Sequence, residues 1–402
     1  MASNTRRIAV LSGLLGVHQR ETIRGVAAYA AGVGNWELEI LKETDESLRS
    51  LRHLQPHGIF LENSISPRLL GVARRSGAAL VGLVANLGLP SVHEVDADDL
   101  AIGVLAADYM AERGVTNAGY LHHPHRFSEL RRAGFTRRLA ERGVVPSVVS
   151  ADARYPGSHG HPGPTVIEAE GERWGWSPIH DVLVQWVQAL PKPAGVFACN
   201  DLGGRHVLKA CQAAGMRVPQ DVMVVAVDND PLVCELVSPS LSSIAVPWVE
   251  IGRRAAGVMD ALLAGQVVAG RTVLPPTGVV TRRSSDLVTV QGNDAVATAV
   301  QFIRDNAHRA IQVADVAERV PVGRRSLEKQ FRAARGHSLL QEIRRAHVGR
   351  AQMLLSETDL KMSTVARRSG FGNASRLAVV FRAITGTSPT DYRRQFRTAG
   401  RD

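Results

Sequence analysis

Short apolar runs alternate with longer amphipathic runs from about residue 6 to residue 283. The short runs are rich in β-branched residues and predict strands at 7–11, 36–41, 58–61, 79–84, 93–95, 118–121, 146–150, 195–198, 222–227 and 243–246. The amphipathic runs predict helices at 21–31, 67–76, 100–113, 128–141, 180–190, 202–214 and 249–263. This alternation predicts parallel, doubly wound α/β sheets. Because the segment is long for one such sheet, we expect two lobes.

Two stretches interrupt the alternation. Residues 151–178 are rich in Gly and Pro and have no hydrophobic period, which predicts a long surface loop. His159 and His161 within it are candidate metal ligands, but two histidines on such a loop are more often simply exposed, and we predict no metal. A second polar stretch predicts a linker at 286–294, which would separate a first domain (1–285) from a second (295–402).

After residue 294 the strand pattern disappears and only helical patterns remain. The same motif occurs twice, at about 313–332 and 363–385. It consists of a short helix, a three- or four-residue turn, and a second helix. This arrangement is a helix-turn-helix, whose second helix can lie in the DNA major groove. In these helices Arg and Asn are suited to guanine and adenine, and Ser to several base edges or to phosphate. The candidate DNA-binding residues are Gly323, Arg324, Arg325, Ser326, Lys329, Asn373, Ala374, Ser375 and Arg376.

Charge is concentrated in the same segment. Residues 290–402 hold 20 Lys and Arg but ten Asp and Glu, which accounts for the whole net charge of +10. A basic helical module joined to a neutral domain is typical of a nucleic-acid-binding protein. The competing interpretation is a basic surface that is merely solvated.

Composition excludes several classes of protein. The 402 residues are 45% hydrophobic and 21% charged, which excludes a disordered or collagen-like chain. No apolar run approaches 18 residues, so we expect no membrane span. The start of the chain resembles a signal peptide only superficially, since no small-residue cleavage site follows. Three cysteines without metal-ligand spacing favour the reducing cytoplasm.

The second helix-turn-helix carries a family signature. Residues 370–394 resemble the AraC/XylS-type transcription regulators, in which a linking helix (here about 339–354) holds two units that enter successive major grooves. Leu377 stands where that family usually has Phe, and Arg376 where Tyr or His is common. The matching positions are Gly370, Phe371, Asn373, Phe381, Arg382, Gly386, Ser388, Pro389, Tyr392 and Arg393.

The first domain carries a second set of recognisable residues: Asp98, Arg131-Arg132-Ala133-Gly134-Phe135, Asn200-Asp201, Val218-Pro219, Asp228-Asn229, Ser242-Ser243-Ile244, Gly252, Leu274-Pro275 and Arg282-Arg283-Ser284-Ser285. On these residues, 6–283 resemble the ligand-binding part of LacI/GalR-type repressors, which share the two-lobed periplasmic sugar-binding fold. That part usually follows an N-terminal DNA-binding headpiece, and this sequence begins directly at the first strand. A LacI-like sensor followed by an AraC-like domain is the arrangement of bacterial regulators of xylose catabolism, which the whole chain resembles. The resemblance implies a sugar-responsive regulator that works as a homodimer on paired half-sites near a promoter and can contact RNA polymerase. We expect activation of genes for the catabolism of a pentose, foremost xylose, while the sequence leaves repression open. It implies no cofactor.

Ligands of parallel sheets bind at the carboxyl ends of strands. Carboxylates and amides there can accept from and donate to sugar hydroxyls, and Arg supplies a rigid donor fork. Some of these residues could instead have a structural role, because an Asp after a strand often caps the next helix. The candidate ligand residues are Arg20, Asp98, Arg131, Asn200, Asp201 and Asp228.

An enzyme is a competing class of function. Cys199 precedes Asn200 and Asp201 and lies near His206 in the sequence, which suggests a nucleophile. However, Cys199 ends an apolar strand, where cysteine is usually a small buried hydrophobe, and no phosphate-binding or nucleophile-elbow motif is present. We therefore expect no catalytic residues. A sugar-binding protein with non-specific DNA affinity, or a regulator that responds to a different small polar ligand, would also fit the sequence.

Overall fold

The computed structural model describes residues 5–13, 16–42, 44–62, 66–84, 87–89, 92–150, 177–268, 270–286 and 294–395. The chain divides into two compact units with the boundary between Val280 and Thr281. Most of the predicted loop 151–178, with His159 and His161, and most of the predicted linker lie outside the described residues. The domain boundaries at 285 and 295 therefore stay predictions.

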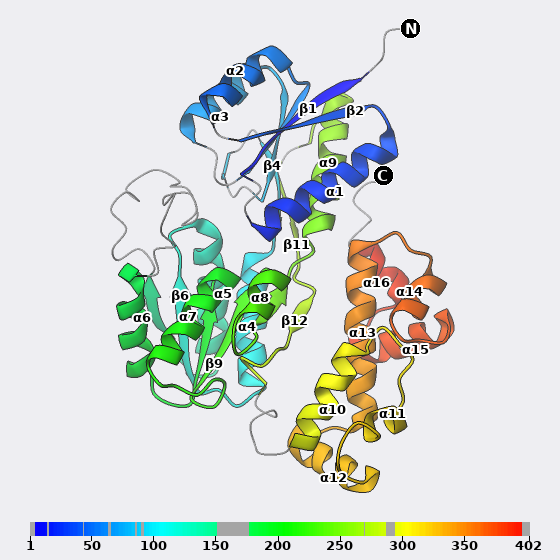
Figure 1. Ribbon diagram of the computed structural model, residues 1–402. Coiled ribbons are helices and arrows are strands. Elements are labelled where there is room, and N and C mark those ends of the chain that lie inside the picture. Colours follow the sequence, from blue (N-terminus) through cyan, green and yellow to red (C-terminus); the bar gives the residue numbers. More distant parts are fainter. Residues whose placement is uncertain are drawn as a thin grey trace. The chain divides into compact units, whose positions relative to one another are not determined.

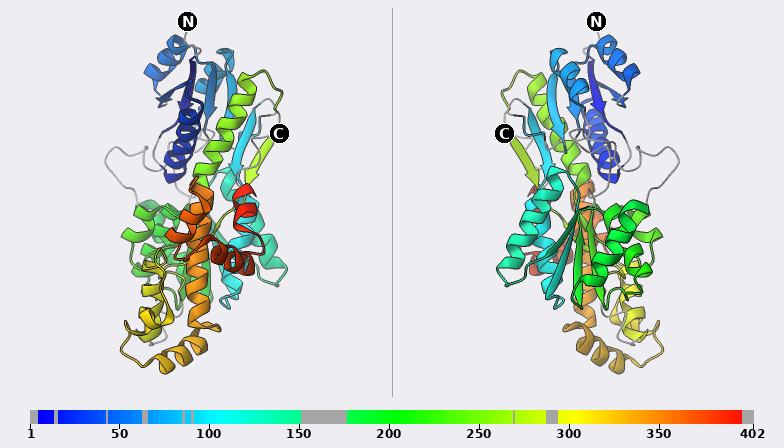
Figure 2. Two further views of the ribbon diagram at one scale, coloured as in Figure 1. Left: turned by 90° about the vertical axis from the view of Figure 1, so that its right-hand side faces the viewer. Right: turned by 90° about the vertical axis from the view of Figure 1, so that its left-hand side faces the viewer.

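The first unit contains two six-stranded sheets, one in each of two lobes (Figures 1 and 2). The first sheet has the order β11-β5-β4-β3-β1-β2, with parallel pairings throughout its described strands. Its strands are β1 (Arg6–Leu11), β2 (Trp36–Leu41), β3 (Gly58–Leu61), β4 (Ala79–Leu83), β5 (His93–Ala97) and β11 (Arg271–Leu274). Its helices are α1 (Val17–Val33), α2 (Asp45–Leu54), α3 (Pro67–Arg75) and α9 (Trp248–Leu263).

Alternate side chains of these strands bury against different helices. Ala9, Leu11, Ile59 and Leu61 form one cluster with apolar residues of α2 and α3. On the other face α1 packs against α9, which also contacts β4 and β5. A sheet that is covered on both faces needs apolar residues at successive positions, which is the pattern that predicted β1 and β3.

The second sheet has the order β12-β10-β9-β8-β6-β7, and its β10–β12 pair is antiparallel while its other described pairs are parallel. Its strands are β6 (Asn117–His122), β7 (Ser147–Ser150), β8 (Ala194–Ala198), β9 (Val222–Val227), β10 (Ser242–Ala245) and β12 (Gly278–Val280). Its helices are α4 (Asp99–Ala111), α5 (Arg126–Ala140), α6 (Ser177–Ala189), α7 (Asp201–Ala213) and α8 (Pro231–Leu236). The chain passes between the lobes at β5–α4, β10–α9 and β11–β12.

Both lobes contain a very close helix crossing. A Cβ atom at Gly252 of α9 would lie 1.9 Å from the Thr22 carbonyl oxygen, and one at Gly25 of α1 would lie 2.0 Å from the Val249 oxygen. The crossing of α4 and α5 is built in the same way by Gly103 and Gly134. Contacts this short leave no room for any side chain, so these glycines set the helix separation.

The second unit is helical. Its helices are α10 (Asp294–Asp305), α11 (Val313–Ala317), α12 (Arg324–Arg335), α13 (Leu339–Glu357), α14 (Met362–Arg368), α15 (Ala374–Thr385) and α16 (Pro389–Gln395). The long helix α13 contacts α10–α12 as well as α14–α16, and so links the two helix-turn-helix units (Figure 1). Among the described residues no helix combines the length and hydropathy that a membrane span requires.

The predicted fold class is confirmed, and the sequence analysis missed short or polar elements. These are α2, α8, β11 and β12. Strands β11 and β12 have four and three residues, too few for a hydrophobic period. Helix α11 ends at Ala317.

Candidate ligand site and candidate nucleic-acid interface

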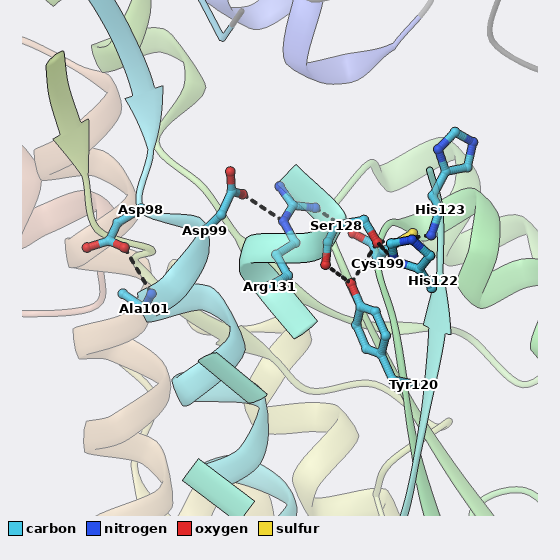
Figure 3. A network of polar contacts seen from close by, with 9 residues as sticks. All are labelled: Asp98, Asp99, Ala101, Tyr120, His122, His123, Ser128, Arg131 and Cys199. Carbon is cyan, nitrogen blue, oxygen red and sulfur yellow. Dashed lines mark hydrogen bonds and ion pairs between the residues drawn. The ribbon is translucent and has the colours of Figure 1, made fainter. Parts of the chain in front are cut away.

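Arg131 is the centre of a buried polar network in the second lobe (Figure 3). Its guanidinium donates from Nε to Asp99 Oδ1 over 2.8 Å and from Nη1 to the carbonyl oxygen of Cys199. The side chains of Arg131 and Asp99 are only 4% and 2% exposed. Burial raises the pKa of Asp99, and the positive charge of Arg131 acts in the opposite direction. With two donors occupied, Arg131 keeps its Nη2 group and one Nη1 hydrogen for further acceptors.

The carboxylate beside Arg131 is that of Asp99, and the predicted ligand residue Asp98 has a different partner. Asp98 accepts a hydrogen bond from the backbone nitrogen of Ala101 over 2.9 Å and so caps α4. Figure 3 shows its carboxylate turned away from Arg131. Asp98 therefore has the structural role of a helix cap, and Asp99 was missed. Two adjacent residues at a helix start face different ways, which a sequence pattern does not resolve.

Asn200 and Asp201 follow β8 and hold neighbouring loops. Asn200 caps α7, with its Oδ1 accepting from the Gly203 nitrogen over 2.8 Å. Asp201 is buried and accepts from the Asp230 nitrogen over 2.7 Å and from the Ser243 hydroxyl over 2.5 Å. Asp201, which follows β8, thus bonds through Oδ2 to the loop after β9 and through Oδ1 to strand β10.

Asp228 follows β9 in a strained backbone conformation. Its φ is +109°, and that of Asn229 is +52°, both in the region that L-residues rarely adopt. Burial, together with the nearby Asp201 and Asp99 carboxylates, raises the pKa of Asp228 well above its ordinary value, and Arg131 opposes this. Such strain persists where the surrounding structure imposes it, which is common at ligand sites.

The first lobe contributes residues to the same region. Arg20 Nη2 of α1 lies 3.6 Å from Asp230 Oδ2 of the second lobe. The His18 ring lies 5.8 Å from the Trp248 ring, centroid to centroid. Burial and the positive charges of Arg131 and Arg20 lower the pKa of His18 to about 4, so this imidazole is neutral at pH 7. The influence of Arg131 on His18 indicates that the histidine lies near the polar network of the second lobe.

Trp248 begins α9 at one of the passages between the lobes. The residue is 5% exposed, and its indole Nε1 is buried without a hydrogen-bond partner among the described residues. An unsatisfied buried N–H group is unfavourable, and the indole that carries this one lies next to the His18 ring. Trp248 was not among the predicted ligand residues. A Trp directly after the Val246-Pro247 turn was the available signal.

The structure thus places Arg20 beside Asp230 and His18 beside Trp248, with Arg131 near enough to Asp228 and His18 to act on their charges. Asn200 and Asp201 hold their loops, and Asp98 caps α4. The role of each residue in ligand binding stays a prediction. Cys199 is buried, and burial raises its thiol pKa to about 12, which disfavours the thiolate that a nucleophile requires.

The two helix-turn-helix units of the second unit match position by position at an offset of 50 residues. Leu327 and Phe331 of α12 are fully buried, as are Leu377 and Phe381 of α15. Each helix ends at a glycine with left-handed φ, Gly336 and Gly386. The predicted DNA-binding residues all lie at the exposed starts of α12 and α15, with Ala374 the least exposed among them.

Asn373 has a structural role that affects its predicted contact with adenine. Its Oδ1 accepts from the Arg376 nitrogen over 2.8 Å and caps α15. Bidentate adenine recognition uses both the amide oxygen and the amide nitrogen. The cap uses one of the two lone pairs of Oδ1 and fixes the orientation of the amide, so only the NH₂ donors of Asn373 are wholly unoccupied by this bond.

Known proteins resemble both units. Residues 107–285 match the model of the periplasmic binding protein-like domain, and residues 316–395 match that of a helix-turn-helix domain. The xylose operon regulatory protein of Escherichia coli K12 is 26% identical over 409 residues, covering 98% of both chains. That of Haemophilus influenzae is 24% identical and covers 98% of this chain and 99% of its own.

Solved structures show the same fold. The solved structure of a xylose-binding transcription activator matches this chain with a TM-score of 0.59 and 24% sequence identity. The match covers 98% of this chain and 99% of the activator. A periplasmic binding protein/LacI transcriptional regulator from Alkaliphilus metalliredigens, in complex with D-xylulofuranose, matches 70% of this chain and 99% of its own, with a TM-score of 0.55 and 17% identity.

Proposed function

We propose that this DNA-binding transcription regulator, which is not an enzyme and which is similar to the xylose operon regulatory proteins, responds to a small uncharged sugar, a pentose such as xylose. The carrying observation is the convergence of Arg131 and Asp228 from the second lobe with Arg20 and His18 from the first. A ligand that touches both sets of residues would favour the closed arrangement of the lobes, because it binds that state more tightly.

The charges around Arg131 favour a neutral ligand. Arg131 is already balanced by Asp99, and Asp228 lies close by. Arg20 is paired with Asp230. A phosphorylated sugar would bring two negative charges beside these carboxylates, whereas free hydroxyls can donate to Asp228 and accept from Arg131.

We assign Trp248 and His18 to the apolar side of the ligand. Their rings can cover the C–H face of a sugar, and a ring or hydroxyl oxygen can accept from the Trp248 Nε1. Asn200 and Asp201 then act as positioning residues for the loops that carry Asp228, and Asp98 as the cap of α4.

On this proposal the protein is a cytoplasmic homodimer that binds paired half-sites near a promoter through α12 and α15. Sugar binding closes the lobes, changes the dimer surface and alters how the DNA-binding units sit on the half-sites. We further propose activation of transcription through contact with RNA polymerase.

A thermal-shift screen of the full-length protein against pentoses, hexoses and their phosphates tests the effector. Ligand at about 100 times its Kd stabilises the folded state by about 2.7 kcal/mol, which raises Tm measurably. We expect a shift with one free pentose and none with its phosphate. A shift only with nucleosides or other polar molecules would replace the sugar with that ligand, and no shift would refute the proposal.

The tryptophans offer a matched pair of variants. Trp248→Phe keeps an aromatic ring but removes the N–H group, and should weaken sugar binding about tenfold, the loss for one hydrogen bond of about 1.4 kcal/mol. Trp36→Phe makes the same change at another buried indole without a partner among the described residues, at the amino-terminal end of β2. The second variant should bind sugar as the parent protein does.

A further inference from the structure

Helices α12 and α15 are equivalent in backbone and core but present different chemistry outward. The exposed positions 324, 325, 326, 328 and 329 of α12 hold Arg, Arg, Ser, Glu and Lys. The equivalent positions 374, 375, 376, 378 and 379 of α15 hold Ala, Ser, Arg, Ala and Val. The first helix therefore presents mainly charged side chains, and the second presents one charge among small and apolar side chains.

Val379 is a strongly exposed apolar side chain on the outward face of α15. It is 68% exposed and occupies the position that corresponds to Lys329 of α12. Exposed Ser375, Arg376 and Arg382 lie four residues before, three before and three after it, so they share its helix face. The apolar side chain of Val379 thus lies between Arg376 and Arg382, two cations that suit a polyanion.

The occupant that fits an apolar contact flanked by cations is the thymine base of duplex DNA. Among the base edges in the major groove, the C5 methyl of thymine is the one apolar group, and small apolar side chains contact it. The flanking Arg376 and Arg382 can neutralise phosphates on either side.

We propose that Val379 packs against a thymine methyl group, so that α15 specifies a T·A pair by apolar contact while α12 recognises bases through charged and polar groups. This rests on the proposed function in one respect, namely that α15 enters the major groove. Arg324 of α12 is partly engaged by Glu328, with 3.0 Å between Arg324 Nε and Glu328 Oε1, so it is oriented along its own helix.

Removal of single methyl groups from DNA tests the proposal. A preferred duplex is first selected from random sequences with the full-length protein. Each thymine is then replaced in turn by deoxyuridine, which lacks only the methyl group. We expect one position in the half-site portion bound by α15 at which affinity falls about fourfold, the change that about 0.8 kcal/mol for a buried methyl-sized group produces.

Variants of Val379 identify the contacting residue. Val379→Ser should bind the thymine and uracil duplexes equally, about as weakly as the parent protein binds the uracil duplex. Val379→Thr keeps one γ-methyl group and should retain part of the discrimination. Val145→Ser makes the first of these changes at an exposed valine of the first unit and should behave as the parent protein.

Three results would overturn the proposal. The first is that no deoxyuridine substitution weakens binding to a duplex that the protein binds specifically. The second is that Val379→Ser keeps the parent's sensitivity. The third is that Val379→Ser changes only transcription by RNA polymerase and not DNA affinity, which would make Val379 a protein contact. Failure to select any preferred sequence would instead refute sequence-specific DNA binding itself.

Discussion

Replacing Arg131 by Met is the most informative change in the first unit. Met has a comparable length and no charge, so the variant leaves a filled site but removes the partner of Asp99. The Asp99 carboxylate would then be buried at 2% side-chain exposure without its ion pair, and the Cys199 carbonyl would lose a donor. The variant isolates the electrostatic role of Arg131 from its volume.

Breaking a buried ion pair by removing one partner costs about 3–5 kcal/mol. Protonation of Asp99 limits this cost, because burial already raises its pKa in the parent protein. Without Arg131 the folded-state pKa rises further above the unfolded value. The variant then loses up to about 1.4 kcal/mol of stability for each pH unit between these two values. We therefore expect destabilisation that is large at pH 8 and smaller at pH 5.

Urea denaturation of the full-length protein at pH 5 and pH 8 measures this, with sugar added to the parent protein alone to identify the transition of the first unit. Arg131→Met/Asp99→Asn should recover part of the stability at pH 8, since it removes the unpaired charge. A loss below about 1 kcal/mol at pH 8, or a loss that does not depend on pH, would show that the pair contributes little.

Further predictions concern packing, pH and capping. Gly252→Ala should lower the stability of the first unit by about 3 kcal/mol in denaturation experiments, because its Cβ would lie 1.9 Å from a carbonyl oxygen. Gly257→Ala is the control on the same helix, where the nearest side-chain atom would be 3.9 Å away, and should be neutral or stabilising. Burial lowers the pKa of His123 to about 3 and that of His206 to about 4. The unfolded chain binds these protons near pH 6.5, so stability should fall as the pH drops from 6.5 towards 4, and a His123→Gln variant should show a shallower fall in denaturation titrations. Asn373→Asp should keep the cap of α15 but lose DNA affinity in binding assays. Asn373→Ala should lose DNA affinity and also destabilise the second unit by about 1 kcal/mol. Equal DNA affinity of Asn373→Asp and the parent protein would argue against a base contact.

The sequence predicted the architecture because that information is local. Strands β8 and β9 are uninterrupted apolar runs, buried at every position, and the helices between strands have a helical hydrophobic period. The second unit was predictable from its repeated helix-turn-helix pattern and its excess of basic residues. Asn373 and Gly386, of residue types that commonly cap helices, stand at the two ends of α15.

Part of the candidate site was also predictable, because parallel strands present their carboxyl ends at one edge of the sheet. Asp228 was predicted on this basis. Arg131 was predicted as a hydrogen-bond donor within the helix expected at 128–141, and its charge acts on Asp228 in the structure. Arg20 was predicted from its loop, and it pairs with the other lobe.

Only the tertiary structure decided which neighbours these residues have. That Asp99 and not Asp98 faces Arg131 depends on the direction of each side chain at the start of α4, which the packing of α4 on α5 determines. The pairing of His18 with Trp248 joins positions 230 residues apart in the sequence. A local pattern specifies which face of an element is buried, but the partner of a polar side chain depends on the separate paths by which distant elements reach the same place.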